Sequence, residues 1–92
     1  MERLSQIMFT RLADDGYLIS PQRRVLVEEV CKEQAIPDVE AFWIRIRSRS
    51  SISWSTVHNG LKLLVRLGLL ERQAEGARNY AYKWAKSLLE QY

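Results

Sequence analysis

The chain has 92 residues, which is the length of one small domain. Its hydrophobic fraction of 47% is ordinary for a globular protein and aromatic residues are plentiful, so the composition argues against a disordered chain. No apolar run approaches the roughly 20 residues of a membrane span, and the N-terminus lacks the pattern of a secretory signal. We therefore expect a cytoplasmic protein without a membrane partner.

The spacing of apolar residues predicts a first helix over residues 2–13. The apolar side chains that recur at steps of three and four are Leu4, Ile7, Met8 and Leu12. This spacing places them on one helix face. Gly16 follows, and glycine suits the left-handed backbone that commonly ends a helix.

A second helix is predicted to begin after Ser20. The Ser20 hydroxyl suits the N-cap position, and Pro21 suits the first helical position, where no amide donor is needed. The stripe expected to be buried consists of Leu26, Val27, Val30 and Cys31. Cys31 is the single cysteine, so it cannot form an internal disulfide, and a buried thiol in a reducing compartment is the expectation.

The break at Ile36 and Pro37 precedes a third predicted helix, over residues 39–47, with Asp38 as its cap. Its apolar face consists of Val39, Phe42, Trp43 and Ile46. Because these four recur at helical spacing, we expect this helix to pack on the core.

A fourth helix is predicted over residues 54–67, after the polar turn 48–53, with Ser53 as its cap and Gly68 as its end. Its inner side consists of Val57, Leu61, Leu64 and Val65. Gly60 lies in mid-helix, where glycine costs about 1 kcal/mol relative to alanine. We attribute this glycine to close packing against a neighbouring helix.

Residues 69–84 read as a strand, a turn at Glu75-Gly76 and a second strand. Tyr80, Tyr82 and Trp84 alternate with other residues, and we assign them to the core and to strand pairing. The predicted fold class is mainly α with a small β-hairpin, a winged helix-turn-helix of three to four helices plus a two-stranded wing. The chain is expected to be one domain, residues 1–92, with an N-terminal helix (1–15), a helical core (20–68), the wing (69–84) and a short C-terminal helix or tail (85–92).

Polar and basic side chains share the outer face of the fourth helix. They are Ser55, Asn59, Lys62 and Arg66, with Thr56 and His58 beside them. In a recognition helix, such short side chains meet base edges in the major groove, and the positive helix end favours phosphate. An asparagine can pair with adenine through two hydrogen bonds, so Asn59 is a candidate for base recognition. Because serine and threonine cap helices everywhere, an ordinary amphipathic surface helix is the alternative interpretation.

The charge distribution adds candidates for phosphate contact. Residues 41–70 contain no acid but do contain Arg45, Arg47, Arg49, Lys62 and Arg66. Acidic residues cluster before that window, so one face is expected to be basic, although chance asymmetry on a solvated surface would look the same. Further candidates are Arg23 and Arg24 after the cap of the second helix, and Arg78 at the second wing strand.

Three segments carry a resemblance to a known family: SPQRRVLVEEV (20–30), VEAFWIRIR (39–47) and ISWSTVHNGLKLLVRLGLLER (52–72). They resemble the N-terminal winged-helix domain of the ferric uptake regulator family, over roughly residues 19–84. That family shows a Thr-Pro-Gln-Arg start and an Ile-Ser-x-x-Thr-Val-Tyr-Arg-x-Leu-x-x-Leu recognition segment, and Arg23 matches its arginine. Where the family has Tyr-Arg, this chain has His58-Asn59, so its preferred DNA sequence is expected to differ. Leu18 stands where many members carry a basic residue that enters the minor groove.

The resemblance implies sequence-specific binding of double-stranded DNA by a bacterial transcription regulator. Family members continue into a dimerisation domain rich in metal ligands, whereas this chain has one histidine and one cysteine. We therefore expect no metal and no other cofactor, and either an excised domain or a short relative that dimerises by other means.

The expected partners are double-stranded DNA and a second copy of the chain, with no small-molecule substrate. An enzyme is not expected, because no paired carboxylates, glycine-rich phosphate loop or nucleophile–base pair is present. The alternative is a winged-helix protein-interaction module that does not bind DNA and exposes a sizeable apolar patch.

Overall fold

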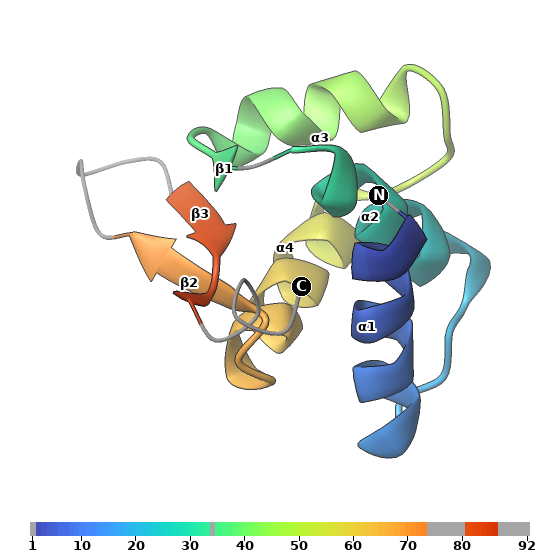
Figure 1. Ribbon diagram of the computed structural model, residues 1–92. Helices are drawn as coiled ribbons and strands as arrows, with labels where there is room; N and C mark the ends of the chain where they lie inside the picture. The colour runs from blue at the N-terminus through green and yellow to red at the C-terminus, as the bar shows by residue number, and fades with distance from the viewer. Residues whose placement is uncertain (1, 34, 74–80, 87–92) are drawn as a thin grey trace.

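The computed structural model describes residues 2–33, 35–73 and 81–86, which form four helices and one three-stranded antiparallel sheet (Figure 1). The helices are α1 (Glu2–Asp14), α2 (Pro21–Lys32), α3 (Val39–Arg47) and α4 (Trp54–Arg66). The strands are β1 (Ala35–Ile36), β2 (Leu70–Gln73) and β3 (Ala81–Trp84). The predicted wing turn, with Arg78 and Tyr80, and the predicted helix or tail after residue 86 lie outside the described residues.

Three helices begin at the predicted capping residues. The Ser20 hydroxyl accepts from the Arg23 amide at 3.1 Å, and the Ser53 hydroxyl accepts from the Thr56 amide at the same distance. Asp38 caps α3 by accepting from the amides of the two residues that follow Val39. Each cap satisfies amides that have no partner inside the helix, which is why these boundaries follow from local sequence.

The predicted glycine ends are also confirmed. Gly16 has a φ of 85° after α1, and Gly68 has a φ of 79° after α4. A side chain would strain the backbone at these angles, so glycine sets where both helices stop.

The sheet has the order β1-β3-β2, so β3 is its central strand. The two predicted wing strands pair with each other, with Leu70 opposite Trp84. The third strand, β1, was not predicted; it comes from the link between α2 and α3, and its Ala35 lies opposite Lys83 of β3. Two residues are too few to show a period-two pattern in the sequence. β1 forms by pairing with the free edge of β3.

A single core joins the helices to the sheet. The largest fully buried side chains are Tyr82, Phe42, Leu4, Met8, Leu12, Leu26, Ile36, Ile46, Leu61, Leu64, Leu69 and Leu70. The predicted inner faces are confirmed, except that Ile7, Trp43 and Val65 are half-buried. Leu63, which the apolar pattern did not single out, is also buried.

Cys31 is a structural thiol, as expected. Its side chain is buried on α2, and its Sγ donates to Sδ of Met8 on α1 at 3.8 Å. Burial raises the pKa of the Cys31 thiol to about 11, and the nearby Glu28 carboxylate acts in the same direction. The thiol therefore stays protonated at neutral pH, where a reactive cysteine would be a thiolate.

Gly60 brings α4 against α2, as its mid-helix position suggested. The residue is buried, and a Cβ built at this position would collide with Cδ2 of the buried Leu26. The close approach of the two helices therefore depends on the missing side chain.

We expect Gly60→Ala to lower the free energy of unfolding by up to about 2 kcal/mol. Overpacking costs about 1–3 kcal/mol, which outweighs the roughly 1 kcal/mol that alanine gains over glycine inside a helix. Urea unfolding measures the change. In a Leu26→Ala background the collision is absent, so Gly60→Ala should cost nothing there; an equal cost in both backgrounds would refute the packing explanation.

Candidate nucleic-acid interface

The outer face of α4 carries the predicted row of polar and basic side chains. Ser55, Asn59, Lys62 and Arg66 are all exposed, while Thr56 and His58 beside them are half-buried. Val57, Leu61 and Leu64 fill the opposite side and lie in the core. The burial of the inner side thus turns the polar row toward solvent, where it is available to a partner.

A polar hollow of about 290 Å³ lies between the first turns of α2 and α4. It is lined by Ser20, Gln22, Arg23, Leu26, Thr56, Asn59 and Gly60. The fold therefore brings Arg23 of α2 beside Thr56 and Asn59 of α4, and all three were predicted to contact DNA. Since Ser20, Arg23, Thr56 and Asn59 border it, the polar hollow offers a guanidinium and polar side chains to an anion.

Arg23 and Arg24 point in different directions from the start of α2. The Arg23 guanidinium donates to the Leu18 carbonyl at 2.8 Å and lies 5.8 Å from the centre of the Tyr17 ring. Arg24 instead lies 4.9 Å from the centre of the Phe9 ring on α1. Arg23 is thus fixed at the edge of the polar hollow, whereas Arg24 covers α1.

Arg45 of α3 and Arg49 just beyond it pair with acids at or near the end of α2, although residues 41–70 contain no acid. Arg45 lies 2.9 Å from a Glu33 oxygen, and Arg49, just beyond α3, pairs with Glu29, which also pairs with Lys32 at 3.4 Å. The structure therefore gives Arg45 a role in holding α3 to α2. Its predicted contact with DNA stays a prediction.

Lys62 and Arg66 of α4, with Arg72 of β2, form what we call the basic face. All three side chains are exposed, and the positive charges of Lys62 and Arg72 both lower the pKa of His58. Among the described residues, no carboxylate lies within ion-pair distance of Lys62 or Arg66. Arg72 was missed by the sequence analysis, because only the packing of β2 against α4 brings it near the recognition helix.

His58 lies between the basic face and Trp54. Its ring stacks on Trp54 with centroids 5.7 Å apart and an interplanar angle of 16°. Burial lowers the pKa of His58 below its ordinary 6.5, and the positive charges of Lys62 and Arg72 lower it further. The imidazole is therefore neutral at neutral pH.

We expect the free energy of unfolding to decrease as the pH falls through 6.5, the ordinary pKa of histidine. Because folding lowers the pKa of His58, the unfolded chain takes up the proton first, and the stability present above the unfolded pKa is lost below it. Urea unfolding at about pH 7.5 and about pH 5.5 should show a smaller decrease for His58→Gln than for the wild type. An equal decrease in both proteins would assign the effect to another group.

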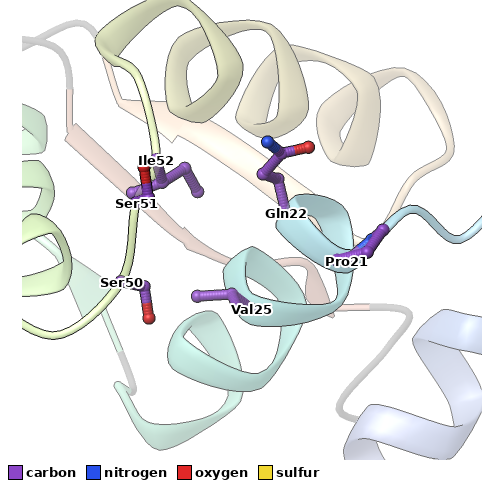
Figure 2. A pocket seen from close by; sticks show the side chains of 6 residues that line it. All are labelled: Pro21, Gln22, Val25, Ser50, Ser51 and Ile52. Carbon is purple, nitrogen blue, oxygen red and sulfur yellow. The ribbon is translucent and has the colours of Figure 1, made fainter.

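A second hollow, of about 340 Å³, lies on the other side of the first turn of α2 (Figure 2). It is lined by Pro21, Gln22, Val25, Ser50, Ser51 and Ile52, and Gln22 borders both hollows. In Figure 2, Val25 and Ser50 approach each other from α2 and from the link between α3 and α4. None of these lining side chains titrates near neutral pH, so this hollow offers no general acid or base.

Two further observations concern the described residues. No group of three or more His, Cys, Asp or Glu side chains there is placed to hold a metal ion. None of the helices in that part of the chain has the length and apolar character that a membrane crossing requires.

Comparison with known proteins gives matches in structure. No family model and no curated protein matches the sequence. One match is a structure of PerR from Streptococcus pyogenes that concerns peroxide sensing and gene regulation. It has a TM-score of 0.75 and 17% sequence identity with this chain, and the match covers 88% of this chain and 56% of PerR. A manganese uptake regulator has a TM-score of 0.66 and 27% identity, over 82% of this chain and 56% of the regulator.

The chain has the winged-helix fold of the ferric uptake regulator family. The predicted fold class is thereby confirmed, with β1 as an addition to the wing. A second PerR structure, GAS PerR-Zn-Zn, matches with the same TM-score of 0.75, over 53% of its length. This winged-helix domain therefore spans a little over half of the length of these regulators.

Proposed function

We propose that this winged-helix domain binds double-stranded DNA as part of a bacterial transcription regulator. The observation that carries the proposal is the exposed row on α4, where Ser55 and Asn59 are followed by Lys62 and Arg66. In winged helices of this kind, the helix after the tight turn enters the major groove, with its first residues nearest the bases. PerR, which has this fold, is described in connection with gene regulation.

In this arrangement the two sides of α4 contact different parts of the DNA backbone. The polar hollow, with Arg23 and Thr56, receives a backbone phosphate beside the groove, and the basic face attracts phosphates on the other side. Asn59, which borders the polar hollow on the side of α4, reads a base edge. Two copies of the domain would read two half-sites, and we propose a homodimer for that reason.

Comparing Lys62→Ala with Asn59→Ala tests whether Lys62 contacts a phosphate and Asn59 a base. If Lys62 contacts a phosphate, its replacement should weaken binding to all duplexes about equally and reduce the slope of log K against log salt by roughly one unit. Asn59→Ala should instead change the sequences that are selected from a random duplex library. Fluorescence anisotropy over a salt series and selection experiments measure the two effects.

A folded wild-type domain that binds no duplex at low salt would overturn the proposal and favour the protein-interaction module. That alternative needs a contiguous apolar patch. The large exposed apolar side chains in the described part of the chain are Leu18, Ile44 and Trp54, which come from three different segments. Equal effects of both substitutions on all sequences would contradict the separate roles of Lys62 and Asn59.

A further inference from the structure

Three rings form what we call the aromatic stack at the start of the proposed recognition helix. Trp54 lies face to face with His58, and its ring meets that of Trp43 on α3 edge-on, with centroids 5.6 Å apart and an angle of 72°. These are the geometries that aromatic pairs prefer. The stack thus connects the first residue of α4 to α3 on one side and to the second turn of α4 on the other.

Trp43 anchors the stack. Its indole nitrogen donates to the Ile52 carbonyl at 3.1 Å, and the Arg47 guanidinium lies 4.4 Å from the centre of its ring. Trp43 is half-buried between these contacts, so it offers a fixed surface on which Trp54 rests. Trp54 therefore loses little side-chain freedom when a partner covers it, which favours binding through this residue.

Trp54 presents apolar surface beside the polar row of α4, next to His58. Its side chain is 39% exposed, although it stands directly before Ser55 and one turn before His58. The neighbouring His58 ring is neutral, as its lowered pKa shows, so it adds no charge to this surface. An exposed indole at this end of α4 would gain from a partner that offers apolar surface of its own.

Within the major groove, thymine is the base that presents a methyl group. We propose that Trp54, positioned by Trp43 and His58, contacts the C5-methyl group of a thymine and thereby selects thymine at one position of each half-site. The inference rests on the proposed DNA-binding function and names the base chemistry that this end of α4 recognises. Asn59, one turn further along α4, would read a neighbouring base through hydrogen bonds, so the two side chains use different chemistry.

The test removes one methyl group at a time. Each thymine of a duplex selected by the wild-type domain is replaced in turn by deoxyuridine, and the dissociation constants are measured. One replacement in each half-site should weaken wild-type binding about fourfold, the effect expected from losing one buried methyl group. With Trp54→Ala the same replacement should have no effect, while Trp54→Phe should keep part of it.

Three outcomes would overturn the inference. In one, no deoxyuridine replacement weakens wild-type binding even though Asn59→Ala still changes the selected sequence; the proposed function then survives alone. In the second, Trp54→Ala is as sensitive to the replacement as the wild type. In the third, the folded wild-type domain binds no duplex, and the proposed function fails together with this inference. A circular dichroism spectrum of each variant confirms that the fold is retained.

Discussion

Replacing both Lys62 and Arg66 by glutamate should reduce the affinity for duplex DNA by more than a hundredfold at about 0.1 M salt. Each phosphate contact contributes close to one order of magnitude at this salt concentration through counterion release. Loss of two contacts therefore accounts for roughly 60-fold, and the two new negative charges repel the backbone in addition. Fluorescence anisotropy with a labelled duplex measures the change, and the salt slope should fall by about two units.

A matched control separates the basic face from net charge. Arg3 and Arg11 are exposed on α1, so replacing both by glutamate changes the net charge by the same amount. This double variant should bind DNA within a few-fold of the wild type, because α1 takes no part in the proposed interface. If both double variants lost affinity equally, the binding would depend on overall charge, and the assignment of the basic face would be wrong.

Phe42→Ala should lower the free energy of unfolding by about 3–5 kcal/mol. Phe42 on α3 is 1% exposed and is among the largest fully buried side chains. Its removal loses the transfer free energy of the ring and leaves a cavity that the surrounding helices and sheet only partly fill. Since small domains are stable by about 5–15 kcal/mol in total, this loss removes a large share of the stability and should lower the midpoint of thermal unfolding. Thermal and urea unfolding followed by circular dichroism measure the loss.

Ile44→Ala is the control on the same helix. Its side chain is 45% exposed, and surface substitutions usually change stability by less than about 0.5 kcal/mol. A loss as large as that of Phe42→Ala would mean that α3 packs differently from the arrangement described. Near-wild-type stability of Phe42→Ala would also mean that α3 packs differently from the arrangement described.

Local sequence predicted the helices because their signals are local. The hydroxyls of Ser20 and Ser53 lie within three residues of the amides that they cap, and Gly16 and Gly68 act on their own backbone. Helical spacing likewise identified most of the buried side chains, since a single helix face determines burial. The row on α4 was predictable for the same reason.

Contacts between distant segments were not predictable in this way. The acid-free window suggested a basic face that includes Arg45, but Arg45 pairs with Glu33 at the end of α2, because acids from outside the window fold against it. Arg72 reaches the neighbourhood of His58 only through the packing of β2 on α4. The assignment of Trp43 to an apolar face gave no sign that it would hold Trp54, since no periodicity within one helix shows how two helices meet.

The position of β3 between β1 and β2 has a consequence for how the chain folds. Ala35 pairs with Lys83, so the segment between α2 and α3 stays without its sheet partner until a stretch much later in the sequence has emerged and closed a long loop. Such closure is entropically slow compared with helix formation. The helices should therefore acquire protection against amide hydrogen exchange early in refolding, while the amides of β1 and β3 acquire it together in the final step.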